Sequence, residues 1–234
     1  MSGSFVLAWL VHLYTALGAV VAFAAIVCIE QRLFVETFWL MFLAVAIDAT
    51  DGALARAARV KELLPWFDGA RLDDIVDYTN YVLVPVYFLF RAELLPAQDG
   101  WWLVALPLLA SAYGFCQTEA KTADHFFQGF PSYWNIVAFY FYVLRTPLWL
   151  NGFTIIILSV LVFVPIHYVY PSRSPLFRVS TIAMGVIWGL LLAIIINRLP
   201  QPSPELAVVS LAYPVYYAAV SLWLELRRLT TSLD

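Results

Sequence analysis

Two pairs of aspartates stand close together in the first third of the chain. Asp48 and Asp51 are three positions apart, and Asp73 and Asp77 are four positions apart. On a helix, each of these spacings places both carboxylates of a pair on the same face. A connection of about a dozen residues makes two helices antiparallel neighbours, so the two pairs are predicted to converge on one site.

Carboxylates that share a site repel one another unless cations neutralise them. Hard divalent cations prefer carboxylate oxygen, and residues 48–56 and 69–77 contain no histidine or cysteine, which favours Mg²⁺ or Mn²⁺ over zinc. Two such ions held by Asp48, Asp51, Asp73 and Asp77 would suit phosphoryl transfer. A single aspartate near a helix end is more often a cap. Capping does not explain why two carboxylates lie on the same face of each of two neighbouring helices.

The composition places the helices that carry these residues in a membrane. Hydrophobic residues make up 63% of the 234 positions and charged residues 12%, against about 25% charged residues in soluble domains. The net charge of −3 and the scattered lysines and arginines exclude a nucleic-acid partner. We therefore predict an all-α polytopic membrane protein with a single catalytic domain over residues 1–234 and the aspartate motif at 48–77.

Eight apolar segments approach the roughly 20 residues that a bilayer span requires. They lie at about 6–29, 33–58, 72–92, 101–120, 132–149, 152–170, 177–197 and 206–226. Lysine and arginine are in excess on the cytoplasmic side of membrane proteins. Placing the 59–71 connection in the cytoplasm puts nine of the 13 cations inside and leaves four outside, so both termini and the aspartate site are predicted to face the cytoplasm.

The spacing of the motif resembles the signature of the CDP-alcohol phosphotransferases, which reads D-x-x-D-G-x-x-A-R, a gap, and then G-x-x-x-D-x-x-x-D. Every fixed position is matched, by Asp48, Asp51, Gly52, Ala55, Arg56, Gly69, Asp73 and Asp77. The gap departs from the pattern, because it usually has eight residues in that family and has 12 here. This longer gap and the eight spans resemble the bacterial phosphatidylcholine synthases, and they make the helices at about 177–226 an addition to a six-helix core.

The resemblance implies a function as well as a fold. It implies transfer of the phosphatidyl group from CDP-diacylglycerol to choline with release of CMP, in the bacterial inner membrane, with two divalent ions (Mn²⁺ or Mg²⁺) on the four aspartates and Asp77 as general base. It also implies a homodimer surrounded by membrane lipids. Arg173, in a rigid turn on the inner side, is a further candidate for the donor phosphates. The residues expected at the donor are Thr15, Asp51, Gly52, Ala55, Arg56, Gly69 and Arg173.

Choline carries a quaternary ammonium group without hydrogen-bond donors, and such groups bind to aromatic faces aided by a carboxylate. Tyr81 lies one turn beyond Asp77 on the same face, and the chain is 17% aromatic. The other candidates lie around the cytoplasmic ends of the fourth and fifth spans. The residues proposed for this site are Tyr81, Tyr113, Glu119 and Trp134, with Tyr133 beside them.

Two alternatives remain open from the sequence. Within the same enzyme class, the acceptor is serine or another alcohol instead of choline. In a different class, acidic residues in membrane helices indicate a cation transporter. The transporter reading is disfavoured because the aspartates lie at helix ends on one side of the membrane and the sequence has no visible inverted repeat.

Overall fold

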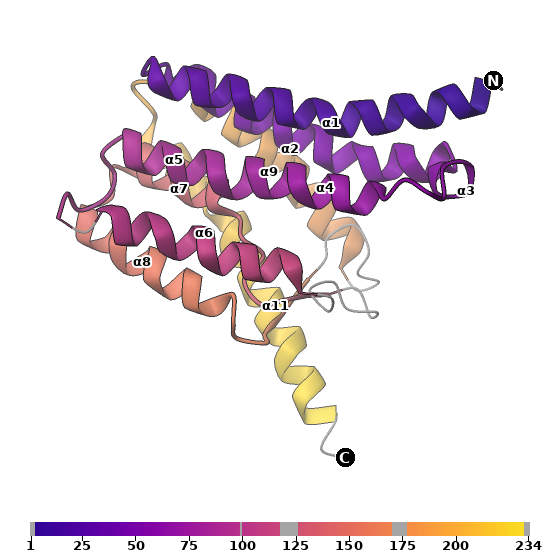
Figure 1. Cartoon of the computed structure of the whole chain (residues 1–234). Coiled ribbons are helices and arrows are strands. Elements are labelled where there is room, and N and C mark those ends of the chain that lie inside the picture. Colours follow the sequence, from indigo (N-terminus) through magenta and orange to yellow (C-terminus); the bar gives the residue numbers. More distant parts are fainter. Residues whose placement is uncertain (1–2, 99, 118–125, 170–176, 232–234) are drawn as a thin grey trace.

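A computed structural model describes residues 3–98, 100–117, 126–169 and 177–231. Nearly all the regular structure in these ranges is helical (Figure 1). The helices are α1 (Gly3–Glu30), α2 (Phe34–Ala57), α3 (Val60–Leu63), α4 (Gly69–Asp77), the π-helix η1 (Tyr78–Leu83), α5 (Val84–Arg91), α6 (Gly100–Cys116), α7 (Trp134–Leu144), α8 (Leu148–Leu161), α9 (Arg178–Asn197), α10 (Pro204–Ser210) and α11 (Ala212–Thr231). Two short strands, β1 (Phe126–Gln128) and β2 (His167–Val169), pair in antiparallel fashion.

The long helices form eight units, and two of these units consist of more than one element. The elements α4, η1 and α5 follow one another directly over residues 69–91, and α10 continues into α11 after one residue. Helices α1, α2, α9 and the segment Pro204–Arg228 are long and apolar enough to cross a membrane, and α6, α7 and α8 are shorter apolar helices. For the described residues, the prediction of an all-α polytopic membrane protein with about eight helices is confirmed.

The surface of the helices is apolar, as expected for a protein whose solvent is lipid. Val179, Leu109 and Phe23 expose 82%, 71% and 68% of their surface, and many other large aliphatic and aromatic residues are exposed in the same way. Soluble monomers rarely expose contiguous apolar surface of this extent. The chain is therefore integral to a membrane.

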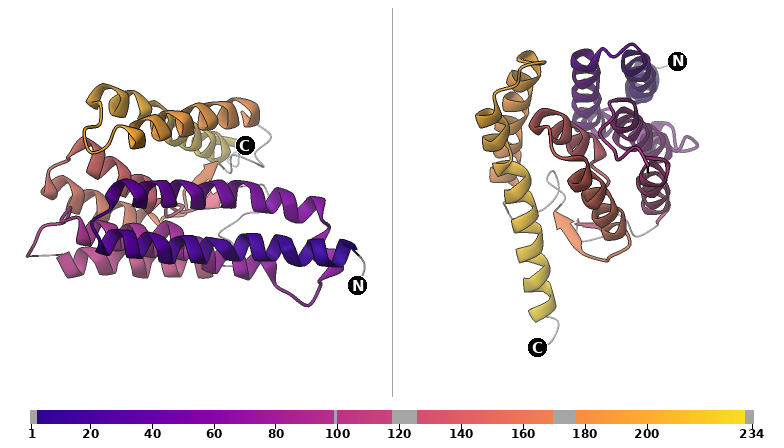
Figure 2. Two further views of the ribbon diagram at one scale, coloured as in Figure 1. Left: turned by 90° about the horizontal axis from the view of Figure 1, so that it is seen from above. Right: turned by 90° about the vertical axis from the view of Figure 1, so that its left-hand side faces the viewer.

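Aromatic rings fill the centre of the bundle. Phe38 of α2 packs against Phe88 of α5 and Phe139 of α7, and all three residues are buried. The hydroxyl of Tyr140 accepts a hydrogen bond from Nε1 of Trp188 at 3.0 Å, which ties α7 to α9. Helices α9 to α11 form a layer on one side of α7, and α1 and α2 lie toward the other side (Figure 2).

Two of the predicted spans are longer than the helices that the structure contains. The fifth span, expected over 132–149, is α7 and ends at Leu144, because Arg145 adopts a left-handed backbone conformation with φ of 49°. The sixth span, expected over 152–170, is α8 and ends at Leu161. Pro165 follows this end, and residues 167–169 pair with β1 instead of continuing the helix.

A tight passage leads from β1 to the start of α7. Gly129 has φ of +81°, and a Cβ atom at this position would lie 2.3 Å from the carbonyl oxygen of Val162. Only glycine fits this conformation so close to another backbone. Ser132, also at positive φ, is buried. The backbone N–H of Phe130 also donates a hydrogen bond to the carbonyl oxygen of Leu161 at 3.0 Å, so the start of the passage is fixed against the end of α8, four residues before α7 begins.

Candidate active site

Three carboxylates meet between α2 and α4. Asp48 of α2 and Asp73 and Asp77 of α4 each place one carboxylate oxygen within 4.8 Å of the others, and all three residues are half-buried. Hard divalent cations bind oxygen at about 2.0–2.6 Å, so oxygen atoms at this separation fit around such an ion. The structure thus brings three of the four motif aspartates into one cluster with the chemistry of a metal site.

The position of α4 is set by close contact with α1. A Cβ atom on Gly69 would lie 2.6 Å from Cε1 of His12, and a Cβ atom on Gly18 would lie 2.5 Å from Cγ1 of Val76. Real Cβ contacts are longer than this, so these two glycines allow the helices to approach. Because Val76 precedes Asp77, this contact also positions the carboxylate cluster.

The start and the end of α4 have different local causes. The carboxylate of Asp68 accepts a hydrogen bond from the backbone N–H of Arg71 at 3.0 Å and caps the helix. At Tyr78 the helix widens into the π-helix η1, a distortion that is common at functional sites. Within η1, the hydroxyl of Tyr81 donates a hydrogen bond to Oδ2 of Asp48 at 2.7 Å.

Asp51 lies beside this cluster and faces α1. Its side chain is buried, and its Oδ2 accepts a hydrogen bond from Oγ1 of Thr15 at 2.9 Å. Asp51 and Asp73 also line the same cavity. The hydrogen bond from Thr15 therefore connects α1 to the motif helix at the boundary between the carboxylate cluster and this cavity.

The cavity has a volume of about 740 Å³ and opens between α1, α2, α3 and α4. This size is typical of pockets that bind small molecules. Six of the seven residues predicted to contact the donor lie in its wall, namely Thr15, Asp51, Gly52, Ala55, Arg56 and Gly69. The seventh, Arg173, lies outside the described residues.

Known proteins of similar sequence share one name. The chain is 40% identical to the phosphatidylcholine synthase of Legionella pneumophila over 92% of its own length and 88% of that protein. It is 35% identical to the phosphatidylcholine synthase of Pseudomonas aeruginosa, covering 92% and 91% of the two chains, and 35% identical to that of Borreliella burgdorferi, covering 94% of each. The chain belongs to the phosphatidylcholine synthase family. No family model matches it.

In this member of the phosphatidylcholine synthase family, the cavity is also lined by residues that the sequence did not indicate. They come from α1 and from the connection between α2 and α4, and they are His12, Arg59, Lys61, Trp66 and Phe67. Arg59 pairs with Glu62, and this hydrogen bond raises the pKa of the Arg59 guanidinium group, which is outside the membrane-spanning helices. The connection between α2 and α4 has no helical periodicity, so its sequence did not indicate that its side chains line a cavity.

Arg56 contributes a third cation and folds back over its own helix. A Cβ atom on Gly52 would lie 3.4 Å from Nη1 of Arg56, so the guanidinium group lies directly above the glycine. The cavity wall therefore carries three cations, Arg56, Arg59 and Lys61, and four acidic residues, Asp51, Glu62, Asp68 and Asp73. This distribution suits a ligand that carries phosphate groups and approaches bound cations.

The residues predicted for choline lie in different environments. Tyr81 contacts the carboxylate cluster directly. The indole of Trp134 is completely buried, and its Nε1 donates a hydrogen bond to Ser111. Tyr113 packs against Phe163 with ring centroids 4.8 Å apart, and Glu119 lies outside the described residues.

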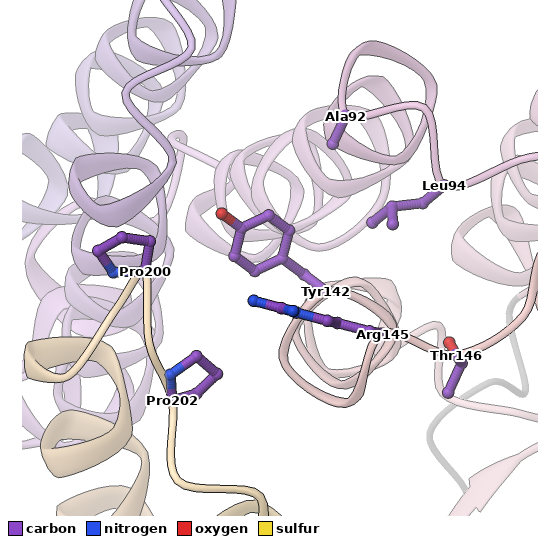
Figure 3. A pocket seen from close by; sticks show the side chains of 7 residues that line it. All are labelled: Ala92, Leu94, Tyr142, Arg145, Thr146, Pro200 and Pro202. Atoms are coloured by element: carbon purple, nitrogen blue, oxygen red, sulfur yellow. The ribbon is translucent and has the colours of Figure 1, made fainter.

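A second, smaller cavity of about 280 Å³ is shown in Figure 3. Its wall comes from the connections between α5 and α6, α7 and α8, and α9 and α10, and it contains one cation, Arg145, beside Tyr142. No carboxylate is among its described lining residues. Among the described residues, Asp48, Asp73 and Asp77 are the one group of three or more His, Cys, Asp or Glu side chains whose ligand atoms lie close enough to share a metal ion.

Proposed function

We propose that the chain transfers the phosphatidyl group of CDP-diacylglycerol to choline and releases CMP. The observation that carries the proposal is that the carboxylate cluster adjoins a cavity of about 740 Å³, which Asp73 of the cluster lines together with the cations Arg56, Arg59 and Lys61. Membership of the phosphatidylcholine synthase family supports the choice of donor and acceptor. We also propose that the protein resides in the bacterial inner membrane with this site facing the cytoplasm, because the excess of cations lies on that side.

The cavity supplies the binding energy for the cytidine diphosphate part of the donor. Gly52 and Ala55 have no side chain beyond a methyl group, so a nucleotide can approach the backbone of α2. Arg56, Arg59 and Lys61 in the cavity wall then neutralise phosphate charge. The diacylglycerol chains remain in the surrounding lipid.

Asp48, Asp73 and Asp77 would hold divalent cations, with Asp51 supporting them from the cavity side. Two such ions, Mn²⁺ or Mg²⁺, when bound, neutralise the diphosphate and its leaving oxygen. The hydroxyl oxygen of choline attacks the phosphorus atom attached to diacylglycerol, and the bond from this phosphorus to the oxygen of CMP breaks. Asp77 accepts the proton of the hydroxyl group, and CMP leaves with the electron pair of the broken bond.

The decisive experiment measures CMP release by the purified protein supplied with CDP-diacylglycerol and Mn²⁺. We expect release with choline, loss of release with EDTA, and recovery when Mn²⁺ is restored. The Asp77→Asn variant should be slower by about 10²–10⁴-fold, the usual contribution of a general base. Asp74→Asn is the matched control, because Asp74 is in the same helix but outside the carboxylate cluster.

The alternatives give different results in the same assay. Release of CMP with serine, but not with choline, would assign another acceptor to the same active site. A cation transporter would release no CMP with any alcohol, and it would instead move a cation across proteoliposome membranes. Either result contradicts the proposed reaction.

A further inference from the structure

Three tyrosines from separate elements form a continuous aromatic line that begins at the carboxylate cluster. Tyr81 belongs to η1 and is bonded to Asp48, Tyr133 precedes α7, and Tyr217 belongs to α11. The ring centroids of Tyr81 and Tyr133 are 6.4 Å apart with an interplanar angle of 70°. Those of Tyr133 and Tyr217 are 6.3 Å apart with an angle of 65°.

These rings are steeply inclined to one another and are not stacked face to face. In these edge-to-face contacts, two neighbouring rings form adjoining walls, and a group placed in the angle that they open can contact both rings. Tyr81 is 8% exposed, while Tyr133 and Tyr217 are only half-buried. The hydroxyl of Tyr81 is occupied by Asp48, so its ring, rather than its hydroxyl group, is available on the side of Tyr133.

A quaternary ammonium group suits such walls. It has no hydrogen-bond donor, so it is recognised by the negative faces of aromatic rings and by nearby carboxylates. Tyr81 lies in the electrostatic field of both Asp48 and Asp77. In choline only two carbon atoms separate the nitrogen from the hydroxyl oxygen. A hydroxyl group that reaches Asp77 therefore leaves the ammonium group within a short distance of the carboxylate cluster.

The position of Tyr217 is held by contacts nearer the C-terminal end of α11. Nδ1 of His167 in β2 lies 2.9 Å from Oε2 of Glu225 in α11, and both side chains are more than 80% buried. This pair joins the β-strands to α11 two turns beyond Tyr217. The strands thereby fix the last helix against the turn that carries Tyr133.

We infer that Tyr133 and Tyr217, with the ring of Tyr81 behind them, bind the trimethylammonium group of the acceptor. This inference rests on the proposed function and extends it, because α11 then becomes part of the acceptor site rather than an addition to the catalytic core. Trp134 and Tyr113 are not needed for this site.

The test compares choline with 3,3-dimethylbutan-1-ol, which has the same shape but no charge, in the CMP assay. The wild-type protein should prefer choline in kcat/KM by up to roughly 30-fold, which corresponds to about 2 kcal/mol for a desolvated cation–π contact. Tyr133→Leu and Tyr217→Leu should abolish most of this preference and leave the KM for CDP-diacylglycerol unchanged. Tyr217→Phe should retain the preference.

Tyr213→Leu is the matched control, because Tyr213 lies one turn away in α11 and stacks on Trp188. It should keep the wild-type preference. If the leucine variants are inactive with both acceptors, phenylalanines with one, two and three ring fluorines at position 217 preserve the shape and weaken the ring face stepwise. The KM for choline should then rise with each fluorine, while that for the neutral alcohol stays constant.

Two results would overturn the inference. One is an unchanged preference in both leucine variants, and the other is a flat response to ring fluorination. Both differ from failure of the proposed function, in which the wild-type protein releases no CMP with choline at all.

Discussion

Replacing Gly18 by alanine should impair activity far more than stability. The new Cβ atom would lie 2.5 Å from Cγ1 of Val76. Because carbon atoms in contact prefer about 3.5–4.0 Å, α1 and α4 must separate by about 1 Å. Val76 cannot relieve the contact by rotating, since it is β-branched and buried. The separation therefore moves the backbone that carries Asp77.

The expected magnitudes follow from this displacement. Overpacking a helix contact costs about 1–3 kcal/mol, and alanine recovers about 1 kcal/mol of helix propensity relative to glycine. The net loss of stability is therefore about 0–2 kcal/mol. A misplacement of about 1 Å at a catalytic group costs on the order of 100-fold in rate. We expect kcat for CMP release to fall by this factor while the protein remains folded.

The assay measures CMP release and thermal unfolding on the same detergent-purified sample. Gly189→Ala is the control, because its Cβ atom would meet only Phe42, at 4.0 Å. It should be as active as the wild-type protein and at least as stable, because alanine has the higher helix propensity. If Gly18→Ala retains activity within about threefold of wild type, the α1–α4 contact does not position the carboxylate cluster and the reasoning is refuted.

Three further variants test other parts of the site. Asp73→Asn should reduce CMP release by at least about 100-fold and raise the Mn²⁺ concentration needed for half-maximal activity, because it removes one of three clustered carboxylates; unchanged Mn²⁺ dependence would contradict this. Thr15→Val should lower activity about tenfold by removing the hydrogen bond to Asp51, and Thr15→Ser should restore it. Lys61→Ala should raise the KM for CDP-diacylglycerol severalfold at low salt but leave the KM for choline unchanged, since Lys61 lines the donor cavity.

The convergence of the carboxylates could be predicted because it depends on helical periodicity. Spacings of three and four residues place two side chains on the same face of a helix, whatever the rest of the fold. Gly52 and Ala55, which the family signature assigned to the donor, follow Asp51 at helical spacings, and all three residues line the cavity. These features are local, so tertiary contacts did not alter them.

The features that the sequence did not reveal depend on contacts between distant residues. The strand pairing of 126–128 with 167–169 ends the sixth helix early, and no alternating pattern marks so short a strand. The proximity of Tyr133 to Tyr217 arises from the return of α11 against the turn before α7. Neither residue has a neighbour in sequence that indicates this partner.

The connection between the two halves of the motif shows how a local irregularity becomes part of the site. Its 12 residues leave room for the short helix α3, whose Val60 packs, together with Leu64, against Ala8 and Val11 of α1. Burial of two aliphatic side chains contributes about 3–6 kcal/mol, enough to hold this segment in place. Once held, it directs Arg59 and Lys61 into the cavity. A longer gap therefore does not weaken the motif, because the added residues extend the donor site with cations that the two motif helices alone do not supply.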